Sequence, residues 1–200
     1  MAWKKDAPPV FLRAKPFRPL QQGFLRSAAP NGSDAYAVLD EYVNGGESLW
    51  FNNYLRGNNL ENLSDRDKER LRFKTATLNR LIKGAPRASQ NMVMFRAISE
   101  DAPRFKRYHK GDDADFLNQG MISTSLEFSA AIDFLEEDET CCLLVILVPK
   151  GTRYLEVLSA SAFSNEEEIL LPHGSRFKIV RTSVVNGVAT YYCIIATQKE

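Results

Sequence analysis

The 200-residue sequence contains little that favours a membrane protein, a metalloprotein or a disulfide-stabilised protein. Its longest uninterrupted apolar run, Cys141 to Val148, has eight residues, whereas a membrane-spanning helix needs about 20. The three cysteines lie inside apolar runs, so we expect buried free thiols in a reducing compartment and no disulfide framework. The two histidines, His109 and His173, are too few and too scattered to form a zinc site with these cysteines, and no metal is predicted.

Neither sign of charge dominates the chain as a whole. Lys and Arg total 26 against 25 Asp and Glu, which gives a formal net charge of +1 and excludes a chain-wide nucleic-acid-binding field. The first 33 residues are uneven, because they hold six basic residues, one acidic residue and five prolines without a sustained apolar period. We predict that residues 1–33 form an extended basic arm or linker with little to bury, serving as a tether, a secretion segment or a partner-binding tail.

Residues 34–200 are predicted to form one domain, whose first half is helical. Ser33 is a favourable N-cap residue, and Gly45-Gly46 ends the helix that follows it. Ser64 is a second N-cap candidate, with Asp65 and Asp67 suited to the positive end of the helix dipole. The predicted helices cover residues 34–44, 49–56 and 65–82, within a helical part that ends at residue 85.

The second half changes to strand patterns. The predicted strands cover residues 92–99, 120–126, 141–148, 166–172, 176–185 and 188–197, with one helix over residues 128–135, in a β core of residues 91–198. The run 141–148 is continuously apolar, which predicts a strand covered on both faces. Asn186-Gly187 predicts a tight hairpin turn. Helices first and strands afterwards favour an α+β fold, with N-terminal helices packed on a mostly antiparallel β-sandwich core.

Three groups of residues carry chemical information. Glu166 and Glu168 share one face of a predicted strand, about 6.6 Å apart along the backbone, although a solvated acidic face explains this pair on its own. The cluster Ser123-Thr124-Ser125 is a polar strand end, which is common. Arg96 is more informative, because a guanidinium between apolar neighbours requires an anion or an exposed face.

The order of these motifs resembles the Arg-Ser-Glu class of mono-ADP-ribosyltransferases, which includes cholera-type toxins, clostridial exoenzymes, bacterial effectors and phage enzymes. Arg96 in MVMFRAIS is similar to the first-strand arginine of that class, and Ser123-Thr124-Ser125 to its Ser-Thr-Ser motif. Residues 166–174 resemble the Glu-x-Glu motif with its Leu-Leu-Pro-x-Gly tail. FNNYLR (51–56) resembles the helical Ile-Asn-x-x-Leu-Arg segment, with Phe51 in place of isoleucine. The resemblance covers about residues 34–195.

This resemblance implies that NAD is the co-substrate and that the protein transfers ADP-ribose. It implies that Glu168 stabilises the oxocarbenium-like state and holds the ribose, and that Ser123 orients the Glu168 carboxylate. The residues implied to bind NAD are Arg96, Arg56, Asn52, Ser123, Thr124 and Ser125, with the two guanidinium groups placed on the pyrophosphate. Ala97 stands where many relatives have glycine, and Phe128 and Phe134 are the candidates for stacking on nicotinamide.

The first glutamate of the Glu-x-Glu motif bears on the acceptor. Relatives with glutamate at the position of Glu166 usually modify arginine, which requires a second carboxylate to attract the cation and help to remove a proton. Phe163 matches an aromatic residue that contacts the target protein in some exoenzymes, and it fits equally well as an aromatic residue packed on the core. We therefore predict Glu168, Glu166 and Ser123 as catalytic residues, with Phe163 and Glu166 recognising the target.

Two alternatives stay open beside an arginine-specific toxin or effector transferase. One is an NAD glycohydrolase that transfers ADP-ribose to water, and the other is an inert binding module of the same fold. The expected partners are NAD and a target protein in a host or competitor cell, with a chaperone or an immunity protein as further candidates, and no membrane or nucleic acid. The N-terminus lacks the apolar core of a signal peptide, so we expect a soluble protein secreted without a cleaved signal and active in the cytosol of a target cell.

Overall fold

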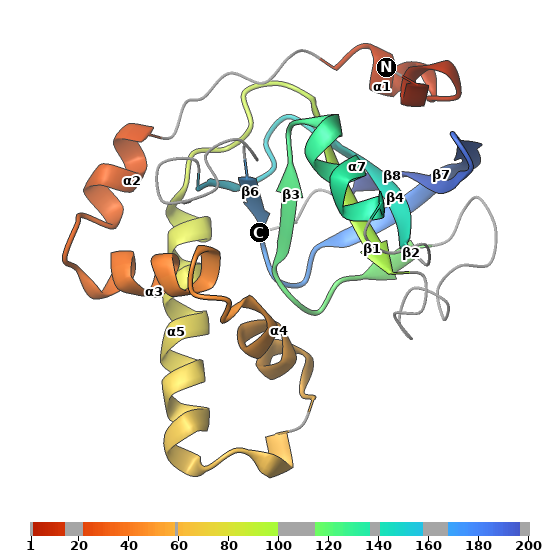
Figure 1. Cartoon of the computed structure of the whole chain (residues 1–200). Coiled ribbons are helices and arrows are strands. Elements are labelled where there is room, and N and C mark those ends of the chain that lie inside the picture. Colours follow the sequence, from red (N-terminus) through yellow and green to blue (C-terminus); the bar gives the residue numbers. More distant parts are fainter. Residues whose placement is uncertain are drawn as a thin grey trace.

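The computed structural model describes residues 2–14, 22–58, 60–99, 115–136, 141–157 and 168–196. Its first half is helical and its second half forms a twisted sheet, with α7 lying on the sheet (Figure 1). The helices after the N-terminal segment are α3 (Asp34–Val43), α4 (Ser48–Arg56), α5 (Asp65–Gly84) and α7 (Phe128–Glu136). None of the helices in these ranges could span a bilayer.

The two predicted N-caps are confirmed. The Ser33 hydroxyl accepts the Tyr36 N–H at 3.2 Å, and the Ser64 hydroxyl accepts the Asp67 N–H at 3.1 Å. Each bond satisfies a backbone donor that has no partner within the first turn of a helix. These caps explain why α3 and α5 begin where the sequence predicts.

Eight strands form one sheet in the order β2-β7-β8-β4-β1-β3-β6-β5. The strands are β1 (Met92–Ser99), β2 (Asp115–Leu117), β3 (Ile122–Ser125), β4 (Cys141–Val148), β5 (Leu155–Glu156), β6 (Glu168–Leu171), β7 (Arg176–Val185) and β8 (Val188–Ile195). All neighbouring strands are antiparallel except β4 and β8. The α+β fold class is therefore confirmed. The sequence did not predict β2, which has only three residues.

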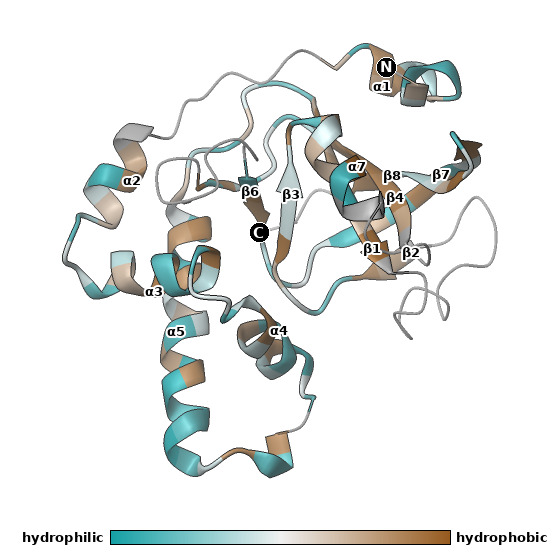
Figure 2. Cartoon of the chain, in the orientation of Figure 1, coloured by the Kyte–Doolittle hydropathy of each residue, from teal (hydrophilic) through white to brown (hydrophobic). Residues whose placement is uncertain are grey.

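The sheet bends sharply between β1 and β3. β1 pairs with β4 along all eight of its residues, but with β3 only through Phe95 and Ser125. Because the strands separate beyond this pair, the β3-β6-β5 part folds over the larger part and encloses apolar side chains from both. Met94 and Ile146 from one part and Ile122 and Ile169 from the other belong to this buried core. Figure 2 shows the apolar colouring most clearly in β1 and β4, whereas β3, with its serines and threonine, is mostly pale.

β4 is buried on both faces, as its continuous apolar run predicts. Successive side chains of a strand point to opposite faces. Leu144 and Ile146 accordingly pack in the core between the two parts of the sheet, whereas Leu143 and Val145 pack on the other face with residues of α7 and of the N-terminal segment. The hairpin after β7 is also confirmed, with Asn186-Gly187 in the left-handed region at φ 52° and 83°.

The N-terminal segment differs from the predicted extended arm. Its described residues form η1 (Ala2–Lys5), α1 (Pro9–Leu12) and α2 (Gln22–Ala28). Trp3 and Phe11 are buried, with ring centroids 5.4 Å from Phe95 and 5.5 Å from Tyr192. The Tyr192 hydroxyl also donates to the Trp3 carbonyl at 2.7 Å.

The prediction of an extended arm rested on proline content and a lack of apolar period. It underestimated isolated apolar residues, because Trp3, Ala7 and Phe11 together remove a large apolar area from water when they pack on the sheet. The boundary at residues 33 and 34 stays a prediction.

Candidate active site

Three of the predicted residues meet where β1 and β3 separate. Arg96 follows Phe95, the last β1 residue paired with β3, and its Nη1 donates to the Ser123 carbonyl. The Ser123 hydroxyl donates to Oε1 of Glu168. β3 and β6 are antiparallel and pair Ser125 with Glu168, so Ser123, Ser125 and Glu168 project from the same face. Residues from three distant parts of the sequence therefore form one polar cluster.

A cavity of about 210 Å³ adjoins this cluster. Among the described residues, its lining consists of Phe95, Arg96, Ala97, Ser123, Thr124, Ser125, Ala130, Ala131 and Glu168. The wall provided by β1 and α7 is largely apolar, whereas the β3 and β6 side carries a hydroxyl and a carboxylate. The cavity therefore has an apolar side and a polar side.

The electrostatics of the site place a cation beside a carboxylate. Burial lowers the pKa of Arg96, and the nearby Tyr42 and Glu168 raise it. An arginine starts so far above neutrality that it keeps its charge. The site thus offers a positive group for an anion and a negative group for a developing cation.

α4 contributes the next two predicted residues. Oδ1 of Asn52 accepts the Met121 N–H at 2.8 Å, which joins α4 to the residue before β3. A Cβ placed on Gly120 would lie 2.5 Å from this Oδ1 and 3.3 Å from Nε of Arg56. Both side chains therefore pass close to the backbone that leads into the Ser-Thr-Ser motif, and only glycine leaves room for them there.

Tyr42 belongs to the site, although the sequence did not single it out. Its hydroxyl accepts from Nδ2 of Asn52 at 3.4 Å, and its side chain is buried. Burial raises the pKa of Tyr42, with smaller effects from Asn52, Arg96, Glu168 and Arg56, so the phenol stays neutral among these charged groups. Its position on the apolar face of a predicted helix is fully explained by packing, which is why no sequence signal separates it from its neighbours.

Two of the predicted NAD-binding residues that line the cavity, Thr124 and Ser125, also make hydrogen bonds within the fold. The Thr124 hydroxyl is buried and donates to the Ile169 carbonyl at 3.0 Å, on the opposite face of β3 from Ser123. The Ser125 hydroxyl accepts the Glu127 N–H at 3.0 Å, next to the start of α7. These bonds hold β3 and α7 in place, and contacts of either side chain with NAD stay a prediction.

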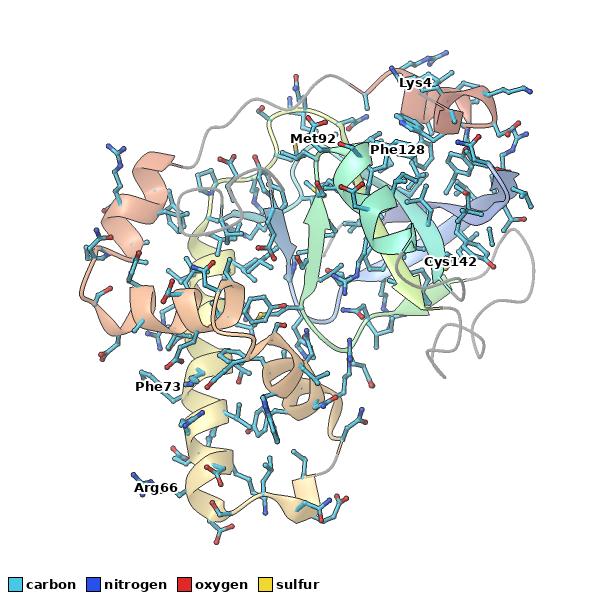
Figure 3. The ribbon with its side chains drawn as sticks, viewed as in Figure 1. Lys4, Arg66, Phe73, Met92, Phe128 and Cys142 are labelled. Carbon is cyan, nitrogen blue, oxygen red and sulfur yellow. The ribbon has the colours of Figure 1, made fainter. Side chains whose placement is uncertain are left out.

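The structure describes only some of the other residues that the sequence predicts for the site. Glu166 and Phe163 lie outside the described residues, as does the side chain of Phe134. Phe128 is partly buried at the start of α7, where its ring meets Phe95 edge to face with centroids 5.4 Å apart (Figure 3). The described residues contain no cluster of three or more His, Cys, Asp or Glu side chains that could hold a metal ion.

One protein-family model and several solved structures match this chain across most of its length. The family model for the ADP-ribosyltransferase exoenzyme matches residues 32–199. C3stau2 from S. aureus, solved with NAD, superimposes with a TM-score of 0.68 at 16% identity, covering 92% of this chain and 99% of that chain. An ADP-ribosyltransferase from Clostridium botulinum, solved in a triclinic form, gives a TM-score of 0.63 at 17% identity, with 91% and 98% covered.

Plx2a, an ADP-ribosyltransferase toxin from Paenibacillus larvae, gives a TM-score of 0.64 at 16% identity, covering 82% of this chain and 87% of that chain. At these identities the structures support the fold alone. No curated protein matches this sequence.

Proposed function

Because this chain belongs to the ADP-ribosyltransferase exoenzyme family, we propose that it cleaves NAD and transfers ADP-ribose to an arginine of a target protein. The observation that carries this proposal is the hydrogen bond from Ser123 to Glu168, with Arg96 bound to the same strand residue. A carboxylate fixed by a hydroxyl, a neighbouring guanidinium and an adjoining cavity are what NAD cleavage requires of a protein.

The proposed roles follow from the charges of these groups. Arg96 and Arg56 bind the pyrophosphate of NAD, since a planar guanidinium matches phosphate oxygens. The bond between C1′ of the ribose and the nicotinamide nitrogen breaks, and its electron pair leaves with nicotinamide. Glu168 faces the positive charge that develops at C1′, and Ser123 holds the carboxylate in that orientation.

The acceptor assignment rests on Glu166. An arginine is protonated at neutral pH, so it needs a carboxylate to draw it towards C1′ and to take the proton released when the new C–N bond forms. Glu166 lies two residues from Glu168, which places both carboxylates on one face if β6 continues to residue 166. We propose that the target is a protein of a host or competitor cell, modified in the cytosol.

The test separates the two half-reactions. The purified protein is incubated with tagged NAD and candidate lysates, and labelled residues are identified by mass spectrometry while nicotinamide release is measured in parallel. Glu166→Ala should lose transfer to protein and keep much of the NAD hydrolysis, because water needs little help to attack the oxocarbenium-like state. Equal loss of both activities would assign Glu166 to NAD binding or to the fold. Label on a residue other than arginine, or undiminished transfer by Glu166→Ala, would overturn the arginine assignment.

A further inference from the structure

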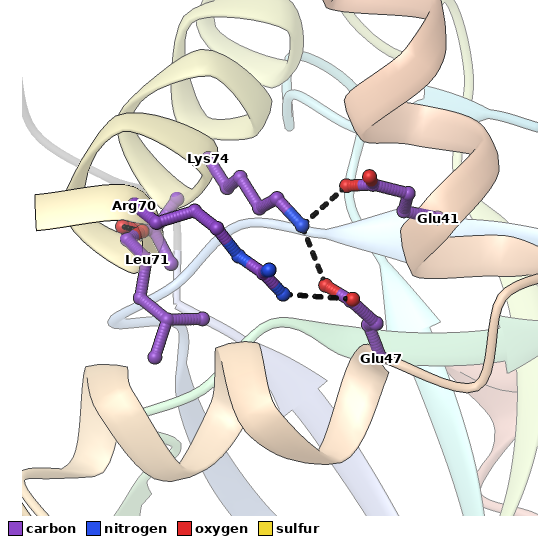
Figure 4. A network of polar contacts seen from close by, with 6 residues as sticks. Glu41, Glu47, Arg70, Leu71 and Lys74 are labelled. Atoms are coloured by element: carbon purple, nitrogen blue, oxygen red, sulfur yellow. Dashed lines mark hydrogen bonds and ion pairs between the residues drawn. The ribbon is translucent and has the colours of Figure 1, made fainter. Parts of the chain in front are cut away.

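Lys74 of α5 has a buried ammonium group outside the candidate active site. Its side chain is 7% exposed, and Nζ contacts Oε2 of Glu41 at 2.5 Å and Oε2 of Glu47 at 2.6 Å (Figure 4). Arg70, one turn earlier on α5, reaches the other oxygen of Glu47 at 3.0 Å. A buried ammonium is costly to desolvate, and two carboxylates are an unusually complete compensation for it.

The two carboxylates stand on either side of the turn that joins α3 to α4. Glu41 lies in the last turn of α3, and Glu47 is the residue before α4. Glu47 makes no side-chain capping bond to α4, and instead directs both carboxylate oxygens to α5. Lys74 and Arg70 therefore tie the start of α4 to the long helix, and Lys74 also ties the end of α3 to it.

Lys74 also reaches the hydrophobic side of α4. Its Nζ lies 5.7 Å from the ring centroid of Phe51, within the range of a cation–π contact. Phe51 is fully buried and meets the ring of Tyr42 edge to face with centroids 5.4 Å apart. Phe51 stands directly before Asn52 and replaces the isoleucine of the related motif, which has no aromatic face for a cation to contact.

A series of contacts leads from Lys74 through Phe51 to the candidate NAD site. Phe51 packs on Tyr42. The Tyr42 hydroxyl accepts a hydrogen bond from Asn52, the residue that follows Phe51. Asn52 in turn accepts the N–H of Met121 before β3. We propose that Lys74 is a positioning residue, which sets the orientation of α4 and so places Asn52 and Arg56 for binding NAD. This inference rests on the proposed function, because NAD is the ligand whose binding it affects.

The effect of removing the charge follows from the same geometry. Lys74→Met keeps an apolar side chain of similar length, but Glu41 loses its contact with Lys74 and Glu47 keeps only Arg70 as a cationic partner, so the two carboxylates repel more strongly. The turn between α3 and α4 should open, and Phe51 should lose its cation. A misplacement of about 1 Å can cost on the order of 100-fold, and here it affects Asn52 and Arg56, which are proposed to hold NAD and not to act at C1′, so the loss should appear in NAD binding. We expect KM for NAD to rise roughly tenfold or more, with kcat changed less than about twofold.

The experiment measures NAD hydrolysis and binding with four variants of the full chain. Lys74→Met is compared with Lys74→Arg, which keeps the cation and should recover most of the NAD affinity. Glu41→Gln removes one of the two carboxylates and should give a smaller rise in KM. The matched control is Arg72→Met on the same helix. The Arg72 side chain is 74% exposed, and its Nη1 makes a long surface ion pair of 3.9 Å with Oε2 of Glu69. The KM of this variant for NAD should not change. A thermal melting curve is measured for each variant, and every assay is run at a temperature below the onset of unfolding.

Hydrogen exchange of the ligand-free protein tests the positioning of α4 without NAD. Amides of residues 48–58 should exchange faster in Lys74→Met than in the wild type, while the β7–β8 hairpin is unaffected. Unchanged exchange in α4, an unchanged KM, or equal losses in Lys74→Met and Lys74→Arg would each overturn the role of Lys74. Faster exchange together with a wild type that neither binds nor hydrolyses NAD would instead overturn the proposed function. If Lys74→Met does not fold, Lys74→Arg and Glu41→Gln decide the question by the same measurements.

Discussion

At the scale of single residues, the candidate site depends on very few contacts. The orientation of the Glu168 carboxylate is set by the Ser123 hydroxyl, and the start of β3 is held by one hydrogen bond that the Met121 N–H donates to Oδ1 of Asn52. Each of these atoms has its partner in a different element, so small changes in side-chain chemistry should alter function more than stability. Two substitutions test this.

Glu168→Gln should abolish NAD hydrolysis and transfer while the protein stays folded. The amide keeps the shape of the side chain and can still accept from Ser123, but it no longer presents a negative charge to the developing cation. A loss of this kind of electrostatic contact costs about 10²–10³ in rate. Nicotinamide release gives the rate, and circular dichroism melting checks the fold. Near-normal hydrolysis by a folded variant would remove Glu168 from the proposed mechanism.

Gly120→Ala should weaken NAD binding by displacing Asn52. The new Cβ would lie 2.5 Å from Oδ1 of Asn52, well inside van der Waals contact, so the bond from Met121 N–H to this oxygen must lengthen or break. Such overpacking costs about 1–3 kcal/mol of stability. We expect a lower Tm and a higher KM for NAD.

Gly84→Ala is the matched control for this substitution. A Cβ there would meet only Phe24 side-chain atoms, at 3.5 Å, which is ordinary contact. Its Tm and KM should stay close to the wild-type values. If Gly120→Ala and Gly84→Ala behave alike, the close approach of Asn52 to residue 120 is not what restricts that position.

At the scale of elements, β4 and β8 form the most enclosed part of the sheet. They run parallel with Ile146 beside Cys193, and β4 is covered on both faces. Burial, with a smaller contribution from Cys142, raises the pKa of the Cys193 thiol far above its usual range. The sheet therefore keeps this thiol protonated and away from solvent.

Cys193 should resist alkylation in the native protein even at pH 9. An ordinary cysteine, with a pKa near 8.5, is mostly thiolate at that pH and reacts readily. Because the pKa of Cys193 is raised, its thiolate stays scarce, and reaction requires the sheet to open. The measurement is iodoacetamide labelling of the Cys193 peptide by mass spectrometry, with a sample in guanidinium chloride as the reactive control. Native labelling at the denatured rate would show that β8 is accessible.

At the scale of the whole molecule, residues near the two ends of the sequence contact each other. Residues 2–14 pack on β8, the last described strand in the sequence, and the Tyr192 hydroxyl donates to the Trp3 carbonyl, whereas α2 lies beside α3 (Figure 1). Trp3 also packs on Phe95, which lines the cavity next to Arg96. The segment thus supports the back of the site wall, which an unattached arm would not do.

Deletion of residues 1–14 should destabilise the protein. Trp3, Ala7 and Phe11 are all buried, and their loss should cost about 2–4 kcal/mol, the order of magnitude for burying one or two large apolar side chains. For a domain of this size, that lowers Tm by roughly 4–16 °C. Lys5→Ala is the control, because this residue is exposed and its replacement keeps the buried rings. Coincident melting curves for the deletion and the wild type would restore the interpretation of residues 1–14 as an unattached arm.

The sequence by itself determined most of the secondary structure and pointed to Arg96, Ser123 and Glu168, which the fold brings together. Caps such as Ser33 and Ser64 and the turn at Asn186-Gly187 act through bonds within a few residues, so local pattern was sufficient to predict them. The unbroken apolar run at 141–148 predicted a doubly covered strand for the same reason. The order of the motifs that include Arg96 indicated the family, although no single motif was sufficient by itself.

Only the tertiary structure decided how these parts meet. Tyr42 is placed at the site by its contact with Asn52 of the next helix, and Trp3 is held on the sheet by Tyr192 near the other end of the sequence. Lys74 is a charged residue on a helix that the sequence alone would leave in solvent, and it is buried because two carboxylates from another part of the chain surround it. Local patterns contain no information on such contacts, because their free energy arises only when distant segments are brought together and water is excluded between them.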